Sequence, residues 1–305
     1  MRVAYLVLAH RNPEQLCRLV RRLGPDAPVF VHVDARARDS FPTRIDGCEL
    51  IPSHRCYWGR FGIVRATLSC IAALVRSGVS YDYAMLLSGQ DYPIKPRDRL
   101  LAFLKGHPGA EFMEVFPLHL PNRWTTHAGS YQAMSRVAHY HLWFRSHHRS
   151  LRIPRRFPAG LTPHGGSQWW CLSRPCLEWV HRFSEERPDV AHYFEHVFIP
   201  DESYFHTVIA ASPFAANVVK DDLKLAIWDR PEPPYPAVLG LRDARRLMSS
   251  RKPFARKFDA SVDATVLDFI DRRILHVEPG AALPGRARSS AHTGGHISGG
   301  RIPSS

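Results

Sequence analysis

The apolar positions of the chain repeat with two different periods from its first residues onward. Residues 3–9 and 28–33 are almost unbroken apolar runs, which is typical of strands buried on both faces of a parallel sheet. Between them, Asn12 and Pro13 predict the N-cap and first turn of a helix. Apolar side chains at helical spacing indicate the helix itself: Leu16, Leu19, Val20 and Leu23. The pattern therefore predicts a β-α-β unit, the building block of an α/β fold.

Similar patterns continue to residue 274. Residues 120–166 are rich in His, Arg, Trp and Tyr without a clear period, so we expect a long excursion over the sheet edge. We predict one α/β domain with a mostly parallel central sheet over residues 1–278. Its further elements, in chain order, are a helix over 62–76, a strand over 82–88, a helix over 96–104, a strand over 111–116, helices that begin near Ser173 and Asp201, and a last helix over 262–274.

Composition changes this picture at the C-terminal end and in the charge. Residues 279–305 consist mainly of Gly, Ser, Ala, Arg and Pro without an apolar pattern, which predicts a disordered basic tail. The chain has 305 residues, with 41 basic against 28 acidic ones and a formal net charge of +13. This excess predicts anionic partners: nucleotide phosphates, nucleic acid or an anionic membrane surface. A merely solvated basic surface explains it equally well.

The chain carries no sign of a membrane span. No stretch of about 18 apolar residues occurs, so we expect no transmembrane helix. The first apolar run lacks the small-residue cleavage site of a signal peptide and is better explained as a strand. The cysteines are scattered without a CxxC pair, which predicts reduced thiols in the core and no zinc site.

Polar loops follow several of the predicted strands. His32 and Asp34 close the second strand, Trp58 precedes the second helix, and Asp91 closes the strand in LLSGQDYPIK. An aspartate just past a strand can accept a hydrogen bond from a uracil or ribose group. Each residue alone is better explained as a turn or cap residue. Three such loops at one edge of a sheet favour a ligand site.

Two further segments carry candidate chemistry. In FIPDESYFHTVI, Asp201 can cap a helix, and Glu202 would then lie in the first turn, where acids simply favour the helix dipole. A glutamate in a wet pocket is also the base that deprotonates a sugar hydroxyl. The stretch RKPFARKFD is either a solvated basic run or a clamp for a diphosphate. Its cations are Arg251, Lys252, Arg256 and Lys257.

Seven segments, in this order, resemble the core 2/I-branching β-1,6-N-acetylglucosaminyltransferase and peptide O-xylosyltransferase family (glycosyltransferase family 14). They are LVLAHRNPEQLCRLVRRL, FVHVDARA, YWGRFGIVRATL, YDYAMLLSGQDYPIK, GSQWWCLSR, FIPDESYFHTVI and FARKFD, and they cover about residues 1–275. The resemblance implies a GT-A-type, Rossmann-like fold and inverting transfer from a UDP-sugar without a divalent metal or another cofactor. The product would be a β-linkage to a hydroxyl of a glycan or glycoconjugate. We expect N-acetylglucosamine first, with peptide O-xylosyl transfer as the alternative.

The resemblance also implies roles for single residues. Glu202 matches the catalytic base and Lys257 the cation that contacts the diphosphate. The second cation is Arg230 or Arg256, because no arginine aligns cleanly in DRPEPPYPAVLG. Two fixed cations would replace a metal, so Asp91 needs no second acid and is not a metal ligand. The nucleotide pocket would then be lined by Val31, His32, Asp34, Trp58, Asp91 and Trp169. The short chain without an evident anchor predicts a bacterial-type cytoplasmic member, at most peripheral to an anionic membrane.

Other classes of function stay open. A nucleic-acid or anionic-lipid binder would use the charge, residues 242–257 and the tail, but no nucleic-acid motif occurs, so we expect no nucleic-acid partner. A non-catalytic sugar-nucleotide binder would not need Glu202 and Lys257. The aromatic residues of the excursion either stack on acceptor sugars or pack the excursion onto the sheet. They are Trp124, Tyr131, Tyr140, Trp143 and Phe144.

Overall fold

The computed structural model describes residues 1–125, 133–144, 147–229 and 236–279. Its centre is a seven-stranded sheet in the order β12-β6-β11-β4-β1-β2-β3. The sheet is parallel except at β11, which runs antiparallel to β4 and β6. The predicted α/β class with a mostly parallel sheet is confirmed. The strands are β1 (Val3–Ala9), β2 (Val29–Val33), β3 (Glu49–Leu50), β4 (Tyr83–Ser88), β6 (Glu111–Met113), β11 (Trp170–Ser173) and β12 (Val218–Val219).

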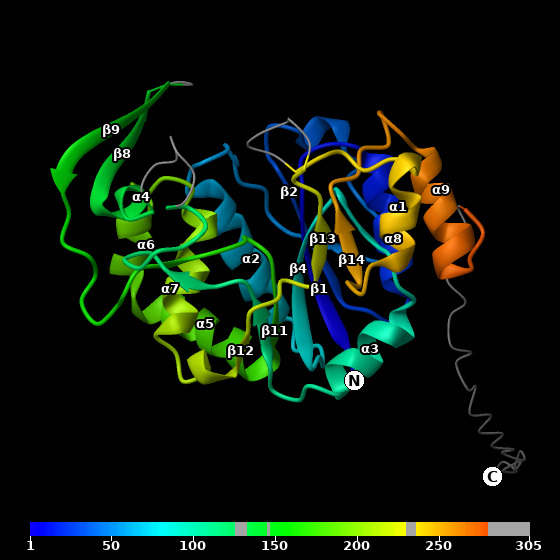
Figure 1. The fold of residues 1–305 in the computed structure, drawn as a ribbon, viewed down its shortest axis with the longest axis horizontal. Helices are drawn as coiled ribbons and strands as arrows, with labels where there is room; N and C mark the ends of the chain where they lie inside the picture. Colours follow the sequence, from blue (N-terminus) through cyan, green and yellow to red (C-terminus); the bar gives the residue numbers. More distant parts are fainter. Residues whose placement is uncertain (126–132, 145–146, 230–235, 280–305) are drawn as a thin grey trace, which may run out of the picture.

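Helices cover both faces of this sheet (Figure 1). Alternate residues of β1 face different cores: Tyr5 and Val7 pack toward α1 and α9, whereas Ala4 and Leu6 pack toward α2 and α5. This two-sided burial explains the unbroken apolar run in the sequence. One layer holds α1 (Pro13–Leu23), α3 (Arg97–Lys105), α8 (Ala244–Ser249) and α9 (Thr265–Ile270), and the other holds α2 (Gly62–Arg76), α5 (Arg174–Glu186), α6 (Pro188–Phe194) and α7 (Tyr204–Ala210).

A small second sheet joins distant parts of the chain. It consists of β13 (Lys224–Ala226), β14 (Phe254–Arg256) and β5 (Asp91–Pro93), with β14 in the middle. Its register places Arg256 opposite Asp91. Two residues that we singled out from separate motifs are therefore neighbours across a strand pair.

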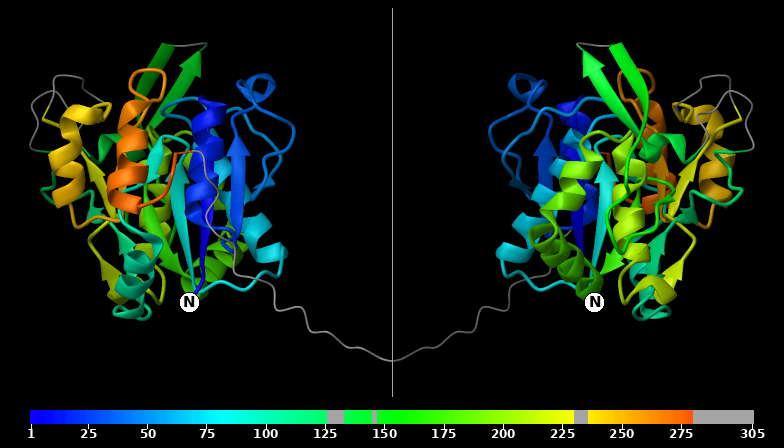
Figure 2. Two further views of the ribbon diagram at one scale, coloured as in Figure 1. Left: turned by 90° about the vertical axis from the view of Figure 1, so that its right-hand side faces the viewer. Right: turned by 90° about the vertical axis from the view of Figure 1, so that its left-hand side faces the viewer.

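The excursion contains a projecting hairpin. Strands β8 (His139–Phe144) and β9 (His147–Pro154) pair antiparallel after the short helix α4 (Ser135–Ala138). The hairpin stands away from the central sheet in Figure 1, and both views of Figure 2 place it at the top of the molecule. A second short pair, β7 (Phe116–Pro117) with β10 (His164–Gly165), closes the base of the excursion.

Several predicted boundaries are wrong. The strand predicted over 111–116 ends at Met113, because the chain leaves the central sheet there to pair with β10. The last helix begins at Thr265 and ends in a π-helical turn, Asp271–Leu275. Asn12 occupies the N-cap position of α1 and Pro13 its first turn, as predicted, but the Asn12 side chain makes no capping hydrogen bond and instead donates to Asp259 Oδ1 over 2.7 Å. The 3-10 turns are Arg38–Ser40, Pro200–Glu202, Ala215–Asn217 and Leu241–Asp243.

All six cysteines are free thiols, and Cys70, Cys171 and Cys176 are buried, as predicted. In the part of the chain that the structure describes, no helix is both long enough and apolar enough to cross a bilayer. The predicted tail from residue 280 onward, Arg230 and Tyr131 lie outside the described residues.

Candidate active site

The carboxyl ends of β1, β2 and β4 form one edge of the central sheet, and the predicted polar loops leave from it. The Asp34 amide donates to the Ala9 carbonyl over 2.8 Å, and the Gly89 amide donates to the Leu8 carbonyl over 2.9 Å. These backbone bonds make the three loops neighbours. Ligands of open α/β sheets bind at such an edge.

Asp34 is a fixed carboxylate at this edge, with only 2% of its surface exposed. Arg36 Nη2 donates to Asp34 Oδ2 over 2.7 Å, and the Cys56 amide donates to Oδ1 over 3.3 Å. Burial alone would raise the pKa of Asp34, but these hydrogen bonds outweigh burial and hold the pKa below its usual value. A ribose or uracil group that binds Asp34 would therefore share this carboxylate with Arg36.

Val31 and His32 lie beneath the edge. The Val31 side chain is fully buried in the core. His32 Nε2 accepts a hydrogen bond from the His54 amide over 2.8 Å, which ties β2 to the 54–56 loop. Burial, followed by the nearby His54, lowers the pKa of His32 to about 4, so this imidazole is neutral at pH 7. Their side chains shape the wall behind the edge, and their contact with a nucleotide stays a prediction.

Asp91 is also fully buried and is held by two cations. Lys224 Nζ lies 2.5 Å from Asp91 Oδ2 and also donates to the Leu86 carbonyl over 2.8 Å. Arg256 Nε lies 3.3 Å from Asp91 Oδ1. Both cations cover the Trp169 ring, with Lys224 Nζ at 3.8 Å and the Arg256 guanidinium carbon at 4.3 Å from its centroid. The predicted residues Asp91, Trp169 and Arg256 thus form one interior cluster.

The pKa of Lys224 is lowered to about 8: desolvation by burial lowers it most, the Asp91 charge offsets part of this, and the Arg256 charge adds to the lowering. Lys224 therefore keeps most of its charge at pH 7 through Asp91. A buried pair of this kind is costly to break, because removing one partner leaves an uncompensated charge in the core. We infer that the cluster positions the Arg256–Lys257 segment.

Lys257 follows this cluster and lies near the end of β1. Desolvation and the charges of Arg11 and Lys257 lower the pKa of His10, whereas the charge of Asp34 raises it. His10, which directly follows β1, therefore lies within electrostatic range of both Asp34 and Lys257. Buried Gln15 strengthens the arrangement: its Nε2 donates to the Gly89 carbonyl over 3.0 Å and to the Phe258 carbonyl over 3.2 Å. The loop after β4 and the segment after β14 are thereby joined.

Glu202 ends the 3-10 turn that precedes α7, and its side chain is 31% exposed. Arg136 Nη1 donates to Glu202 Oε2 over 2.8 Å. Within the described chain no residue donates to Oε1. The Arg136 guanidinium itself stacks on Trp124, with 3.8 Å between its carbon and the ring centroid. Glu202 is therefore an oriented carboxylate with one oxygen open to a substrate hydroxyl.

The two halves of the site meet at the loop that carries Trp58. Trp58 is 46% exposed, and its ring meets Phe198 edge-on at 5.7 Å between centroids. The Ile199 amide donates to the Gly59 carbonyl over 3.2 Å, which fixes the start of the Glu202 turn against this loop. Burial raises the pKa of the Cys56 thiol to about 12, and the charges of both Asp34 and Asp201 contribute. Cys56 thus lies between the β2 edge and the Glu202 turn.

Asp201 does not cap a helix, contrary to our expectation. It is 6% exposed, and its Oδ1 has no hydrogen-bond partner among the described residues. Burial, followed by the adjacent Glu202 charge, raises the pKa of Asp201 to about 7. An aspartate in an unfolded chain has a pKa of about 3.9. Between these values the folded state holds a proton that the unfolded state has released.

This difference predicts a pH dependence of stability. The contribution of Asp201 is fully present below the unfolded pKa and is lost as pH rises through about 7. The free energy of unfolding of Asp201→Asn, relative to the parent protein, should therefore increase by about 2–4 kcal/mol between about pH 4 and about pH 8. Urea unfolding at both pH values measures it, with the exposed Asp98→Asn variant as control. An equal difference at both pH values would contradict the raised pKa.

The aromatic residues of the excursion divide into two groups. Trp124 is 7% exposed beneath Arg136, and Trp143 stacks on Phe198 at 6.3 Å between centroids. These two side chains pack the excursion onto the body of the protein, which was one of the two alternatives given for the aromatic residues. Tyr140 and Phe144 are exposed on the hairpin.

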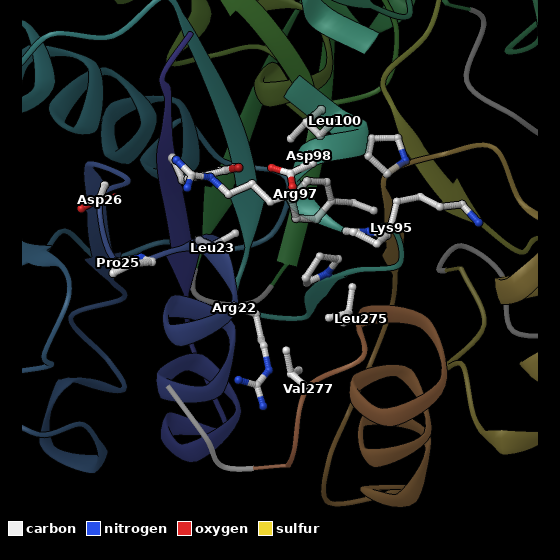
Figure 3. Close-up of a pocket in the computed structure, with 15 residues that line it drawn as sticks. Arg22, Leu23, Pro25, Asp26, Lys95, Arg97, Asp98, Leu100, Leu275 and Val277 are labelled. Carbon is white, nitrogen blue, oxygen red and sulfur yellow. The ribbon is translucent and has the colours of Figure 1, made fainter. Parts of the chain in front are cut away.

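A cavity of about 310 Å³ lies at the opposite, amino-terminal end of the sheet. Figure 3 shows Arg22, Lys95 and Arg97 around it. Arg22 is already bound to Asp271 at 2.7 Å, and Lys95 donates to the Met248 carbonyl over 3.0 Å. Glu202 and Lys257 do not line this cavity. Throughout the described ranges, no three His, Cys, Asp or Glu side chains gather as a metal-ion site would require.

A family model described as Core-2/I-Branching enzyme matches residues 3–247. The chain belongs to the Core-2/I-Branching enzyme family. The fold described above is accordingly of the GT-A type, with a mostly parallel sheet whose carboxyl edge presents the loops. The predicted resemblance is confirmed at the level of the family.

Named members of this family include xylosyltransferase 2 of Rattus norvegicus, which is 27% identical over 89% of this chain and 33% of its own length. Xylosyltransferase oxt of Drosophila melanogaster is 28% identical over 75% of this chain and 27% of its own length. Beta-glucuronosyltransferase GlcAT14B of Arabidopsis thaliana is 29% identical over 93% of this chain and 68% of its own length. The chain thus spans about a third or less of the two xylosyltransferases. These three relatives lend no support to the expected bacterial type.

The structure adds residues to the site of this family member that the sequence did not single out. Lys224 stands in the strand LKLA, where a lone lysine looks like an ordinary edge residue. Arg136 and Arg36 are single arginines in an arginine-rich chain. The apolar residues on both sides of Lys224 in LKLA were the one sequence signal that could have marked this lysine as buried.

Proposed function

We propose that this chain transfers a sugar from a UDP-sugar to a hydroxyl of a glycan or glycoconjugate, with inversion and formation of a β-linkage. The observation that carries the proposal is the position of Glu202. It is a half-buried carboxylate, oriented by Arg136 and joined through the Trp58 loop to the carboxyl edge of the sheet, in a member of the Core-2/I-Branching enzyme family. Inverting transfer is a single displacement, in which an acceptor hydroxyl replaces the diphosphate at the anomeric carbon. It needs an oriented base next to the edge that is proposed to bind the nucleotide.

In the proposed step, Glu202 Oε1 accepts the proton of the acceptor hydroxyl. The hydroxyl oxygen then attacks the anomeric carbon of an α-linked donor from the face opposite the diphosphate. The bond between the anomeric carbon and the diphosphate oxygen breaks, and UDP leaves with the electron pair. The protonated Glu202 afterwards releases its proton to water. Arg136 keeps the carboxylate in place during this sequence.

We propose that cations of the protein, rather than a divalent metal, face the departing diphosphate. Lys257 is the first of them, because it follows the Asp91–Lys224–Arg256 cluster and lies in electrostatic range of His10. The Arg256 guanidinium is committed to Asp91 and Trp169, which makes it a support for Lys257. The other candidate for the second cation, Arg230, remains a prediction.

Transfer should therefore survive removal of divalent ions. We expect turnover in excess EDTA to stay within about twofold of the untreated value, because fixed cations supply the stabilisation of the leaving group. Initial rates with radiolabelled donor, before and after dialysis against EDTA, measure this. Loss of turnover on chelation that manganese restores would refute metal-free transfer.

The donor sugar is tested by a thermal-shift and hydrolysis panel. We propose UDP-N-acetylglucosamine as the donor. The names of the rat and fly relatives favour UDP-xylose as the second candidate, and the Arabidopsis relative adds UDP-glucuronic acid to the panel. The true donor should raise the melting temperature above the value with UDP alone. It should also be hydrolysed slowly in the absence of acceptor. A panel in which no UDP-sugar exceeds UDP would overturn the proposed activity.

A further inference from the structure

The sequence between Glu114 and Glu178 contains no acidic residue. The same stretch is rich in histidine and arginine, and the β8–β9 hairpin lies at its centre. In most of the sequence before residue 279, acids and bases are interspersed. An acid-free stretch on a projecting element makes this hairpin locally cationic.

The two faces of the hairpin differ sharply. The inner face packs on the body: His141 and His148 stack on Phe198 at 5.6 and 4.5 Å between ring centroids. The outer face carries Leu142 and Leu151, and Tyr140, the cross-strand partner of Leu151, is exposed at one edge while its ring also meets His196 at 5.7 Å between centroids. Side chains exposed on the hairpin include Leu142 (39%), Phe144 (75%), Leu151 (40%) and Ile153 (55%). Such a gathering of exposed apolar side chains on a projecting hairpin is typical of an interaction surface.

Cations accompany this apolar surface. Arg149 lies opposite Leu142 in the strand pair, and Arg152 and Arg156 follow on β9 and just after it. All three are exposed, and none of them forms an ion pair with a described residue. The outer face therefore combines aliphatic side chains with Arg149, while Arg152 and Arg156 add exposed positive charge close by, and no described residue offsets these charges in an ion pair.

We propose that the outer face of the β8–β9 hairpin docks on an anionic lipid surface. Aliphatic side chains enter the boundary between headgroups and acyl chains, while arginines next to them bind lipid phosphates. A glycan is a less suitable partner for this face. It would bind through aromatic rings and hydrogen bonds, and contact with Leu142, Leu151 and Ile153 would add little to its affinity. A second copy of this chain is a poor partner. A twofold contact places the same surface of both copies together, so Arg149 would face another acid-free, positively charged surface and be repelled.

The hairpin is rigidly connected to the candidate active site. The Phe198 amide donates to the Arg136 carbonyl over 3.0 Å, and Arg136 holds Glu202. Docking through the outer face would thus set the orientation of Glu202 relative to the lipid surface. This proposal goes beyond the proposed function and does not depend on it, because it concerns the exposed side chains of the hairpin and not the groups proposed for the transfer step.

Co-sedimentation with vesicles tests the proposal. We expect binding of the full chain to vesicles that mix phosphatidylcholine with phosphatidylglycerol, and much weaker binding to phosphatidylcholine alone. The variants Leu142→Ser/Phe144→Ser and Arg149→Glu/Arg152→Glu should each lower the partition constant by about tenfold or more. Raised salt should weaken vesicle binding of the parent protein and leave vesicle binding of the charge-reversed variant almost unchanged. Matched controls are Val262→Ser, 69% exposed at another place, and Arg99→Glu on α3, both of which should bind like the parent.

Three outcomes would overturn the proposal. Equal vesicle partition constants for the hairpin variants and the controls would place the membrane contact elsewhere on the protein. Equal binding to neutral and anionic vesicles would remove the role of the arginines. Binding to soluble dextran sulfate that Leu142→Ser/Phe144→Ser leaves intact, without vesicle binding, would assign the surface to anionic polysaccharide. Thermal unfolding and the shift caused by UDP are measured on every variant, so a folding defect or failure of the proposed transfer is recognised separately.

Discussion

The Glu202→Gln variant is expected to lose transfer activity by about 100- to 10,000-fold, the range that general-base catalysis supplies. Glutamine preserves the shape of the side chain and can keep a hydrogen bond with the Arg136 guanidinium through its carbonyl oxygen. It cannot accept the proton of an attacking hydroxyl. The loss should therefore lie in the chemical step, while UDP still raises the melting temperature as it does in the parent protein.

Initial transfer rates at saturating donor and acceptor provide the measurement. Glu186→Gln, at an exposed position at the end of α5, is the matched control and should keep the parent rate. Turnover of Glu202→Gln equal to that of the control would show that another group is the base. A folded variant that fails to bind UDP would instead place Glu202 in the donor pocket.

Replacing Lys257 with methionine is expected to lower kcat/KM by about 100- to 1000-fold, since electrostatic stabilisation of a developing charge commonly has this size. Methionine keeps the apolar stem but removes the charge that we propose faces the departing diphosphate. Affinity for UDP should fall as well. The effect on kcat should be larger than the effect on binding if Lys257 meets the charge that develops as the bond breaks.

Calorimetric titration of UDP together with steady-state kinetics separates these two effects. Lys105→Met, at an exposed position at the end of α3, removes the same charge from another part of the molecule and should leave both quantities unchanged. Unchanged kcat in Lys257→Met would exclude this lysine from the clamp. Addition of manganese that restores the variant to parent activity would also contradict a purely protein-based clamp.

Local sequence patterns were sufficient for much of the scaffold. The helix over 62–76 was predicted at its observed bounds, because apolar residues recur at helical spacing along it without interruption. The strand over 3–9 was equally clear, since both of its faces are buried. The expectation that the loops with Asp34 and Asp91 open on one edge of the sheet followed from the parallel topology alone.

The environment of each site residue was not predictable in the same way. Glu202 ends a 3-10 turn rather than lying in an α-helix, because Ile199 takes a left-handed conformation (φ 53°) before Pro200. Its partner Arg136 is contributed by the excursion, where the sequence has no clear period. Likewise, nothing near Asp91 in the sequence indicates that Lys224 and Arg256 neutralise it. Such pairs depend on the tertiary fold and leave no periodic signal.

The small β13-β14-β5 sheet also bears on how the protein is made. Asp91 leaves the ribosome long before Lys224 and Arg256, the two cations that meet it in the finished core. Until the last quarter of the chain has been synthesised, this carboxylate has to stay hydrated, so β5 cannot settle into its final place. Nascent chains that stall before Lys224 should accordingly be open at the carboxyl edge of the sheet and sensitive to proteases there, even where β1, α1 and β2 have already folded.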